Sequence, residues 1–262
     1  MRPCLLAAAL LLWPASACAA LRTRTVEYKQ GKTVLQGYLA FDDSATGKRP
    51  GVLVIHEWMG LNDYAKRRAE QLAGLGYVAF AADIYGKGVR PANMQQAGEQ
   101  AKIYRDDRAL LRARAAAGLD TLRKQEHVDP QRLAAIGYCF GGTAVLELAR
   151  SGAKISGVVS FHGGLATPRP EDARQIGAKV LALHGADDPH VPAKELAAFE
   201  EEMRRAKVDW QLNIYGGAVH SFSNPASGND PSKGIAYNAR ADRRSWDAMK
   251  LFFGEIFGQP KQ

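Results

Sequence analysis

The chain has 262 residues, of which 46% are hydrophobic and 24% are charged. This composition is typical of a globular protein and excludes a disordered chain, a collagen-like repeat and a coiled coil. The formal net charge is +8, but the basic residues occur as short scattered groups such as Arg204-Arg205 and Arg243-Arg244. Such groups are typical of solvated helix faces, so we expect no nucleic-acid partner.

Residues 1–20 have the three parts of a secretory signal peptide. A positive charge at position 2 precedes an apolar run at 5–13, and the small residues at 17–19 form an A-x-A cleavage site. We expect cleavage near Ala19 or Ala20 and export to the periplasm. An alternative is a lipoprotein acylated on Cys18, although Ala15 stands where a bulky aliphatic residue is usual. No stretch reaches 18 consecutive apolar residues, so we expect no membrane span.

From residue 34 onward, short apolar runs alternate with amphipathic stretches. The runs predict buried strands and the amphipathic stretches predict helices. The expected strands are 34–41, 52–55, 77–82, 133–136, 155–161, 180–183 and 210–215. The expected helices are 62–75, 143–150, 193–207 and 245–257, with one or two more within 91–124. This alternation predicts an α/β fold with a mostly parallel sheet covered on both faces, and residues 21–262 form a single domain without linker or repeat.

The segment Gly137 to Gly142 follows the expected strand 133–136 and opens a helix. It contains the pattern G-x-C-x-G, in which a sharp strand-to-helix turn presents the nucleophile and the flanking side chains must be minimal. The helix N-terminus favours the Cys139 thiolate. Removal of the signal peptide takes away Cys4 and Cys18, so Cys139 would be the last cysteine and no intramolecular disulfide could form. The alternative is a glycine-rich turn with an incidental cysteine.

An acid and a histidine follow later strands, in the order expected of α/β-hydrolases. Asp187 and Asp188 lie in the loop after the expected strand 180–183, and His220 lies in a glycine-rich loop after the last strand. The chain order nucleophile, acid, histidine is that of the α/β-hydrolases. In such a triad the histidine moves the proton and the carboxylate holds the imidazole in the required tautomer.

Five segments together resemble the dienelactone hydrolase family, a cysteine-dependent branch of the α/β-hydrolases. They are residues 56–62, 83–87, 137–142, 185–192 and 220–222. The resemblance implies hydrolysis of a small-molecule carboxylic ester or lactone through a thioacyl-enzyme. The family's acid loop reads G-x-x-D-x-x-V-P, which selects Asp188 over Asp187.

The resemblance also assigns roles to the loop after the expected strand 52–55. A glutamate at the position of Glu57 contacts the resting nucleophile in the family and takes part in its activation; the alternative is an exposed loop carboxylate. The backbone N–H groups of Trp58 and Phe140 are the expected oxyanion-hole donors.

The family's two carboxylate-binding arginines have no counterpart here. Their positions are occupied by Lys87 and Asn224, which we expect to contact the substrate together with Tyr85 of the segment Asp83 to Lys87. Lysine lacks the bidentate fork of arginine, and asparagine lacks the charge. Neutral esters should therefore compete with carboxylated ones to within about a hundred-fold.

Other classes of function make different demands on the sequence. No cysteine–histidine cluster has zinc-ligand spacing and no phosphate-binding glycine motif is present, so we expect no metal and no cofactor. We expect a monomer. A non-catalytic exported binding protein on the same fold has no reason to retain Cys139, Asp188 and His220 together. A thiol redox role would need a second, resolving cysteine after signal cleavage.

Overall fold

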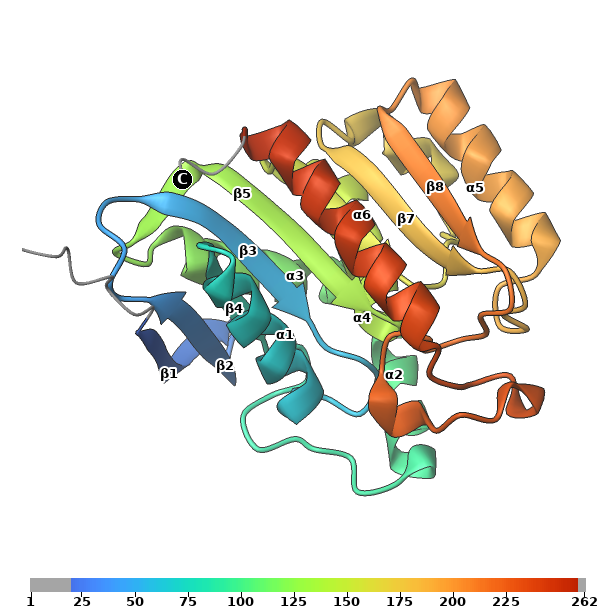
Figure 1. The fold of residues 1–262 in the computed structure, drawn as a ribbon, viewed down its shortest axis with the longest axis horizontal. Coiled ribbons are helices and arrows are strands. Elements are labelled where there is room, and N and C mark those ends of the chain that lie inside the picture. Colours follow the sequence, from blue (N-terminus) through green and yellow to red (C-terminus); the bar gives the residue numbers. More distant parts are fainter. Residues whose placement is uncertain (1–19, 259–262) are drawn as a thin grey trace, which may run out of the picture.

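The computed structural model describes residues 20–258. The expected signal peptide, apart from Ala20, and the alternative lipid attachment at Cys18 lie outside the described residues. Eight strands form one sheet in the order β1-β2-β4-β3-β5-β6-β7-β8 (Figure 1). Strand β2 is antiparallel to both neighbours and all other pairs are parallel. The strands are β1 Leu21–Gln30, β2 Thr33–Asp42, β3 Arg49–Ile55, β4 Val78–Ala82, β5 Val128–Tyr138, β6 Gly157–Phe161, β7 Lys179–Gly185 and β8 Trp210–Tyr215.

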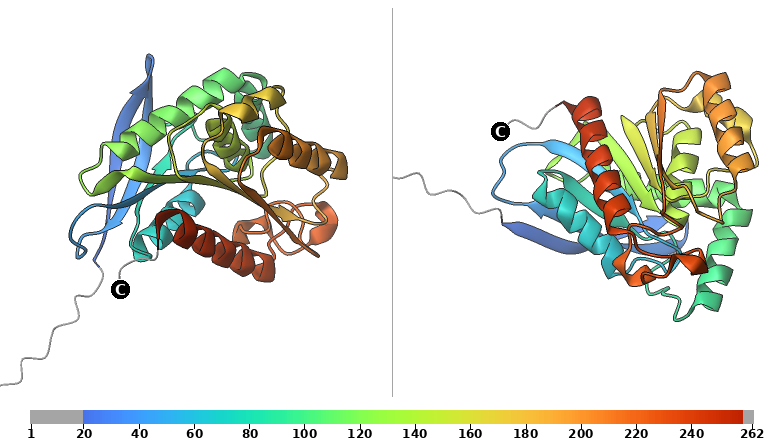
Figure 2. Two further views of the ribbon diagram at one scale, coloured as in Figure 1. Left: turned by 90° about the horizontal axis from the view of Figure 1, so that it is seen from above. Right: turned by 45° about the vertical axis from the view of Figure 1, so that its right-hand side comes forward.

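Helices cover both faces of this sheet (Figure 2). Helices α1 and α6 pack on one face, and α3, α4 and α5 pack on the other. Strand β3 shows why the apolar runs are continuous, because Val52 and Val54 face the first layer while Leu53 and Ile55 face the second. The helices are α1 Asp63–Gly74, α2 Met94–Asp106, α3 Arg108–Arg123, α4 Phe140–Arg150, α5 Ala193–Ala206 and α6 Ala239–Phe257, with short 3₁₀ turns η1 Pro170–Gln175, η2 Pro225–Ser227 and η3 Pro231–Lys233.

The predicted α/β-hydrolase architecture is confirmed, with local differences in the bounds of its elements. Strand β1 was not predicted, because it is an edge strand whose residues are mostly exposed and only Tyr28 is buried. The stretch 91–124 forms two helices that break at Asp107, whose side chain accepts a hydrogen bond from the Leu110 N–H and caps α3. Helix α6 begins at Ala239, earlier than expected, because Asn238 caps it.

The parallel strands direct four loops to one edge of the sheet. In Figure 1 the arrowheads of β3 and β5 point toward α2 and the start of α4. Glu57, Cys139, Asp188 and His220 all follow the carboxyl ends of strands at this edge, where open α/β sheets bind ligands. Within residues 20–258, no helix is both long enough and apolar enough to cross a membrane.

Candidate active site

Cys139 occupies a strained turn between β5 and α4. Its φ of 53° and ψ of −113° lie in a region that non-glycine residues rarely adopt. The Cys139 N–H donates to the Phe161 carbonyl oxygen at 3.0 Å and to Nδ1 of His162 at 3.1 Å. These bonds hold the turn against the neighbouring strand β6, so that the thiol lies at the first turn of α4.

The two glycines of the elbow permit backbone contacts that no side chain would allow. A Cβ on Gly137 would lie 2.0 Å from the Gly141 carbonyl oxygen, and a Cβ on Gly141 would lie 2.2 Å from the Ile55 carbonyl oxygen. The obstructing atoms are backbone, so they cannot move aside without displacing β3 or α4. The sequence prediction that these positions require glycine therefore has a direct steric basis.

Gly141→Ala should lower the free energy of unfolding by at least about 2 kcal/mol, because the new methyl group overpacks the contact between α4 and β3. The measurement is the urea midpoint of the purified variant. Gly74→Ala is the matched control, since its Cβ meets nothing within 4 Å at the exposed end of α1. That change should be neutral or stabilising by up to about 1 kcal/mol. Equal effects of the two substitutions would contradict the steric explanation.

His220 bridges the thiol and a buried carboxylate. Its Nε2 lies 3.1 Å from Sγ of Cys139, and its Nδ1 lies 2.8 Å from Oδ2 of Asp188. The other oxygen of Asp188 accepts the N–H of His190 at 2.8 Å. Asp187 is exposed and makes no side-chain contact with His220 among the described residues. The structure thus brings Cys139, Asp188 and His220 together, as the register of the acid loop predicts.

The charges of this cluster perturb one another. Burial lowers the pKa of His220, but the Cys139 thiolate and the Asp188 carboxylate outweigh burial and raise that pKa to about 10. Burial raises the pKa of Asp188, but the hydrogen bond and the charge of His220 hold that pKa below its usual value. The arrangement therefore favours the imidazolium form of His220, which is the form that can protonate a leaving group.

Two backbone N–H groups near Sγ are available as oxyanion donors. Neither the Trp58 N–H nor the Phe140 N–H has an intramolecular acceptor within residues 20–258. His56 fixes the loop that carries Trp58, since its Nδ1 donates to the Glu57 carbonyl oxygen at 2.6 Å while its Nε2 accepts the Ile84 N–H at 3.2 Å. Burial lowers the pKa of His56 to about 4, so the ring stays neutral in this role.

Glu57 lies in the site but makes no hydrogen bond to Cys139 among the described residues. Its carboxylate is buried and accepts the Ser221 hydroxyl at 2.9 Å and the Asn224 amide N–H at 2.5 Å. Burial raises the pKa of Glu57, and these two donors oppose that rise. Glu57 is therefore not an exposed loop carboxylate. The contact with the resting thiol that the resemblance implies is instead made by His220.

The structure places Lys87 and Tyr85, which we expect to contact the substrate, outside the lining of the cavity described below. The Lys87 N–H is bound to the Val34 carbonyl oxygen of β2, so its ammonium group reaches Glu27 on the exposed edge hairpin, outside the cavity described below. Tyr85 is buried, and its hydroxyl donates to the Trp58 carbonyl oxygen at 2.8 Å. Tyr85 therefore supports the loop that carries Trp58.

Asn224 does line the cavity, but its side chain is already engaged. Its amide N–H is donated to Glu57, and its Oδ1 accepts the Ala226 N–H at 2.9 Å. An arginine here would not reproduce these contacts. The sequence comparison with the family identified the position but not the partner, because Glu57 and Asn224 are 167 residues apart.

A cavity of about 920 Å³ opens onto Cys139, and its charged lining was not predicted from the sequence. Arg105 and Arg108 enter it from the junction of α2 and α3, and Lys233 enters it from η3. Both arginines belong to a stretch whose sequence is typical of a surface helix, and they lie on either side of the break at Asp107. No group of three His, Cys, Asp or Glu side chains within residues 20–258 is placed to hold a metal ion.

His162 is a further residue at the site that the sequence motifs do not mark. It is buried, and its ring joins the Cys139 N–H to the Ser223 hydroxyl, with Nε2 to Oγ at 2.7 Å. Because Nδ1 accepts the Cys139 N–H, the proton is on Nε2 and is donated to Ser223. Its position at a strand end was the only sequence signal.

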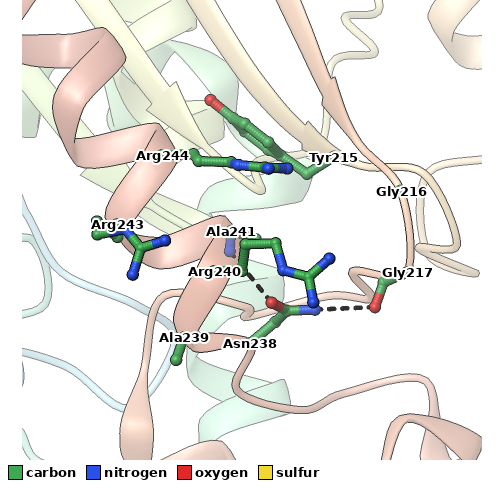
Figure 3. Close-up of a pocket in the computed structure, with 9 residues that line it drawn as sticks. All are labelled: Tyr215, Gly216, Gly217, Asn238, Ala239, Arg240, Ala241, Arg243 and Arg244. Atoms are coloured by element: carbon green, nitrogen blue, oxygen red, sulfur yellow. Dashed lines mark hydrogen bonds between the residues drawn. The ribbon is translucent and has the colours of Figure 1, made fainter.

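A second, smaller depression lies beside the N-terminal end of α6 (Figure 3). Its volume is about 570 Å³, and its lining includes the exposed arginines Arg240, Arg243 and Arg244 together with Tyr215. None of the residues predicted for catalysis lines it. Three of the residues predicted for catalysis, Glu57, Cys139 and His220, line the cavity at Cys139 instead.

Comparison with known proteins agrees with the geometry. The model of the dienelactone hydrolase family matches residues 35–257. A solved structure named m3DLH is 48% identical, with a TM-score of 0.88, and covers 91% of this chain and 99% of its own. A dienelactone hydrolase-like promiscuous phosphotriesterase from metagenomic libraries is 46% identical, with a TM-score of 0.87, and covers 91% of this chain and 100% of its own.

A protein of Synechocystis sp., named by inference as a carboxymethylenebutenolidase, is 27% identical over 248 residues, which cover 89% of this chain and 96% of that protein. The family match extends from strand β2 to the last residue of helix α6, so it includes every strand end that carries a residue of the site. The chain therefore belongs to the dienelactone hydrolase family and is a hydrolase of the ester and lactone class.

Proposed function

We propose that the protein is an exported hydrolase that cleaves a carboxylic ester or lactone with Cys139 as nucleophile, His220 as acid and base, and Asp188 as the group that orients His220. The observation that carries this proposal is the continuous contact from Sγ of Cys139 through both ring nitrogens of His220 to Oδ2 of Asp188. Support for export comes from the signal-peptide pattern of residues 1–20.

The proposed reaction has two halves. The Cys139 thiolate adds to the substrate carbonyl carbon, and the resulting oxyanion accepts the N–H groups of Trp58 and Phe140. Collapse of this intermediate breaks the carbon–oxygen bond, and the imidazolium of His220 gives its proton to the departing alkoxide. Water then gives a proton to His220 as it attacks the thioester carbonyl, which releases the acid and restores the thiolate–imidazolium pair.

Glu57 has a supporting part in this proposal. Burial raises the pKa of Glu57, while the charge of His220 is close enough to lower it in turn. A Glu57 carboxylate therefore stabilises the imidazolium that forms beside the thiolate. The family resemblance implies that Glu57 takes part in activating Cys139. In this proposal Glu57 starts from the position in which it accepts hydrogen bonds from Ser221 and Asn224.

A screen of purified mature protein against short-chain 4-nitrophenyl esters and simple lactones tests the proposed function. A thioester adduct on the Cys139 peptide, trapped by acid quench and detected by mass spectrometry, is the expected result with a slow substrate. A non-catalytic binding protein would form no adduct and show no turnover. N-terminal sequencing of the protein recovered from the periplasm should begin near Ala20 or Leu21.

The titration of His220 should depend on the thiol. In the wild type its imidazolium should persist to about pH 10, because the thiolate and Asp188 stabilise the charged form. In Cys139→Ala one of these anions is gone, so the pKa of His220 should fall. The measurement is an NMR pH titration of the imidazole resonances, with His127, outside this cluster, as the internal control. Loss of the wild-type His220 proton below pH 7 would contradict the ion pair.

A further inference from the structure

Backbone strain within residues 20–258 is concentrated around one buried histidine, His162. Four non-glycine residues in this range have a positive φ, and three of them lie at the site. These three are Cys139 at 53°, His162 at 40° and Ser221 at 60°. Such conformations are costly and persist only where the surrounding contacts enforce them. The contacts of His162 are therefore candidates for positioning the reacting atoms.

The ring of His162 holds the peptide that carries the nucleophile. The Cys139 N–H is shared between two acceptors, the Phe161 carbonyl oxygen at 3.0 Å and Nδ1 of His162 at 3.1 Å. Two acceptors resist rotation of this peptide more than one would, because a hydrogen bond weakens steeply as it bends. The His162 backbone is itself held, since its N–H donates to the Leu183 carbonyl oxygen at 2.8 Å. His162 therefore helps to fix the direction in which the Cys139 side chain leaves the turn.

The other ring nitrogen of His162 reaches the loop that carries His220. Its Nε2 donates to Oγ of Ser223 at 2.7 Å, and Ser223 is three residues after His220. The rings of His162 and His220 also meet edge to face, with centroids 5.5 Å apart. One buried side chain thus contacts both the peptide of the nucleophile and the loop of its proton-transfer partner.

Ser223 is anchored in turn to helix α1. Its Oγ lies 2.7 Å from the hydroxyl of Tyr64, and its carbonyl oxygen accepts Nη2 of Arg68 at 2.8 Å. Arg68 is also paired with Asp242 of α6. Ser223, Tyr64 and Arg68 are buried, and a satisfied buried network of this kind is rigid. The link from Cys139 through His162 to Ser223 therefore ends on two packed helices.

This link requires a neutral His162 ring. A protonated ring would turn an N–H at Nδ1 toward the Cys139 N–H, and the two donors would repel each other. Burial, followed by the charges of His220 and Arg68, lowers the pKa of His162 well below its usual value. Nδ1 therefore remains available as an acceptor.

We propose that His162 is a positioning residue for hydrolysis, which sets the separation between Sγ of Cys139 and Nε2 of His220 through its bonds to the Cys139 N–H and to Ser223. This inference rests on the proposed function and goes beyond it. His162 is not part of the cavity lining, so it acts through Cys139 and His220 and not on the substrate. Misplacement of an attacking group by about 1 Å is enough to cost about a hundred-fold in rate.

His162→Phe tests the proposal, because it keeps an aromatic ring and removes both hydrogen bonds. The Cys139 N–H keeps the Phe161 acceptor and Ser223 keeps Tyr64, so neither is left unpaired. With a short-chain 4-nitrophenyl ester, kcat should fall by about a hundred-fold while KM changes by less than about three-fold. His127→Phe, outside the site, is the matched control and should change kcat by less than about two-fold. An unchanged kcat in His162→Phe, or a loss carried by KM, would overturn the proposal.

His162→Asn should restore much of the lost rate. Its Oδ1 can accept the Cys139 N–H in place of Nδ1, so kcat should lie within about ten-fold of the wild type. Urea midpoints report the cost to the fold separately, including that of a positive φ, which asparagine adopts more readily than phenylalanine. A kcat of His162→Asn as low as that of His162→Phe, with both variants folded, would contradict the role of the Nδ1 acceptor.

Ser223→Ala breaks the same link without altering position 162. It should lower kcat by about ten-fold, and the double variant with His162→Phe should lose less than about two-fold more than His162→Phe alone. Fully additive losses would show that the two residues do not act through one link, and would overturn the proposal.

Nitrogen-15 NMR of the wild-type imidazole rings tests the link without any substitution. His162 should be neutral, with its proton on Nε2 and none on Nδ1. A proton on Nδ1 would overturn the proposal even if His162→Phe failed to fold. The proposed function has a separate test, because it fails only if Cys139→Ala still hydrolyses the neutral esters.

Discussion

Cys139→Ala should reduce kcat on a short-chain 4-nitrophenyl ester by about 10³-fold or more, and His220→Ala should cost nearly as much. The reason is geometric, because Sγ of Cys139 and Nε2 of His220 are only 3.1 Å apart. Removal of either side chain leaves the other without a partner for proton transfer. Members of such a unit are not additive, so the double variant should lose little more than either single one.

Alkylation provides an independent measurement of the same nucleophile. Residues 20–258 contain one cysteine, the partly exposed Cys139. Stoichiometric iodoacetamide should therefore give a single adduct on the Cys139 peptide, with activity lost in proportion to the adduct. Full activity in the alkylated enzyme would exclude the thiol as nucleophile. Unfolding midpoints of Cys139→Ala and of the wild type should agree closely, which separates loss of chemistry from loss of fold.

Asp188→Asn should lower kcat by about 10²- to 10⁴-fold, because an amide in place of the carboxylate stabilises the wrong imidazole tautomer and no longer stabilises the imidazolium. Asp188 is buried and lies 2.8 Å from Nδ1 of His220. The pKa of His220 should fall in the same variant, since the Asp188 carboxylate is one of the groups that raise it.

Asp187→Asn is the matched control for this prediction. Asp187 precedes Asp188 in the same loop but is exposed, and its N–H is bound to the Ala218 carbonyl oxygen. Its substitution should change kcat by less than about two-fold, as is usual for surface positions away from such networks. The reverse result, a damaged Asp187→Asn beside a mild Asp188→Asn, would show that the loop register is wrong.

The oxyanion loop depends on contacts that reach beyond the catalytic residues. The Trp58 carbonyl oxygen accepts the Tyr85 hydroxyl, and the Glu57 carbonyl oxygen accepts His56. These bonds orient the peptide unit that contains the Trp58 N–H and the peptide unit that follows it. A donor fixed in this way needs little reorganisation when the oxyanion forms, and such preorganisation is the usual source of oxyanion-hole stabilisation.

The sequence by itself determined the architecture and the chain order of the candidate catalytic residues. Apolar runs marked the buried strands, and these strands lie where they were expected, because burial on both faces of a parallel sheet demands apolar side chains at every position. Gly137 and Gly141 identified the strand-to-helix turn at Cys139. Only glycine fits at these two positions, because a Cβ would collide with neighbouring backbone atoms. The motif register selected Asp188, and the structure places Asp188, Cys139 and His220 in contact.

Only the tertiary structure decided what lines the cavity. A position in the sequence says which strand a residue follows, but the direction of a long side chain depends on partners from distant elements. Lys87 forms an ion pair with Glu27, and the side-chain amide of Asn224 donates a hydrogen bond to Glu57. Arg108 lines the cavity from the first turn of α3, while the nearby Glu147 is bound by Arg112 and Arg150. No local sequence pattern records such contacts between distant elements, so the charged lining of the cavity is visible only in the folded chain.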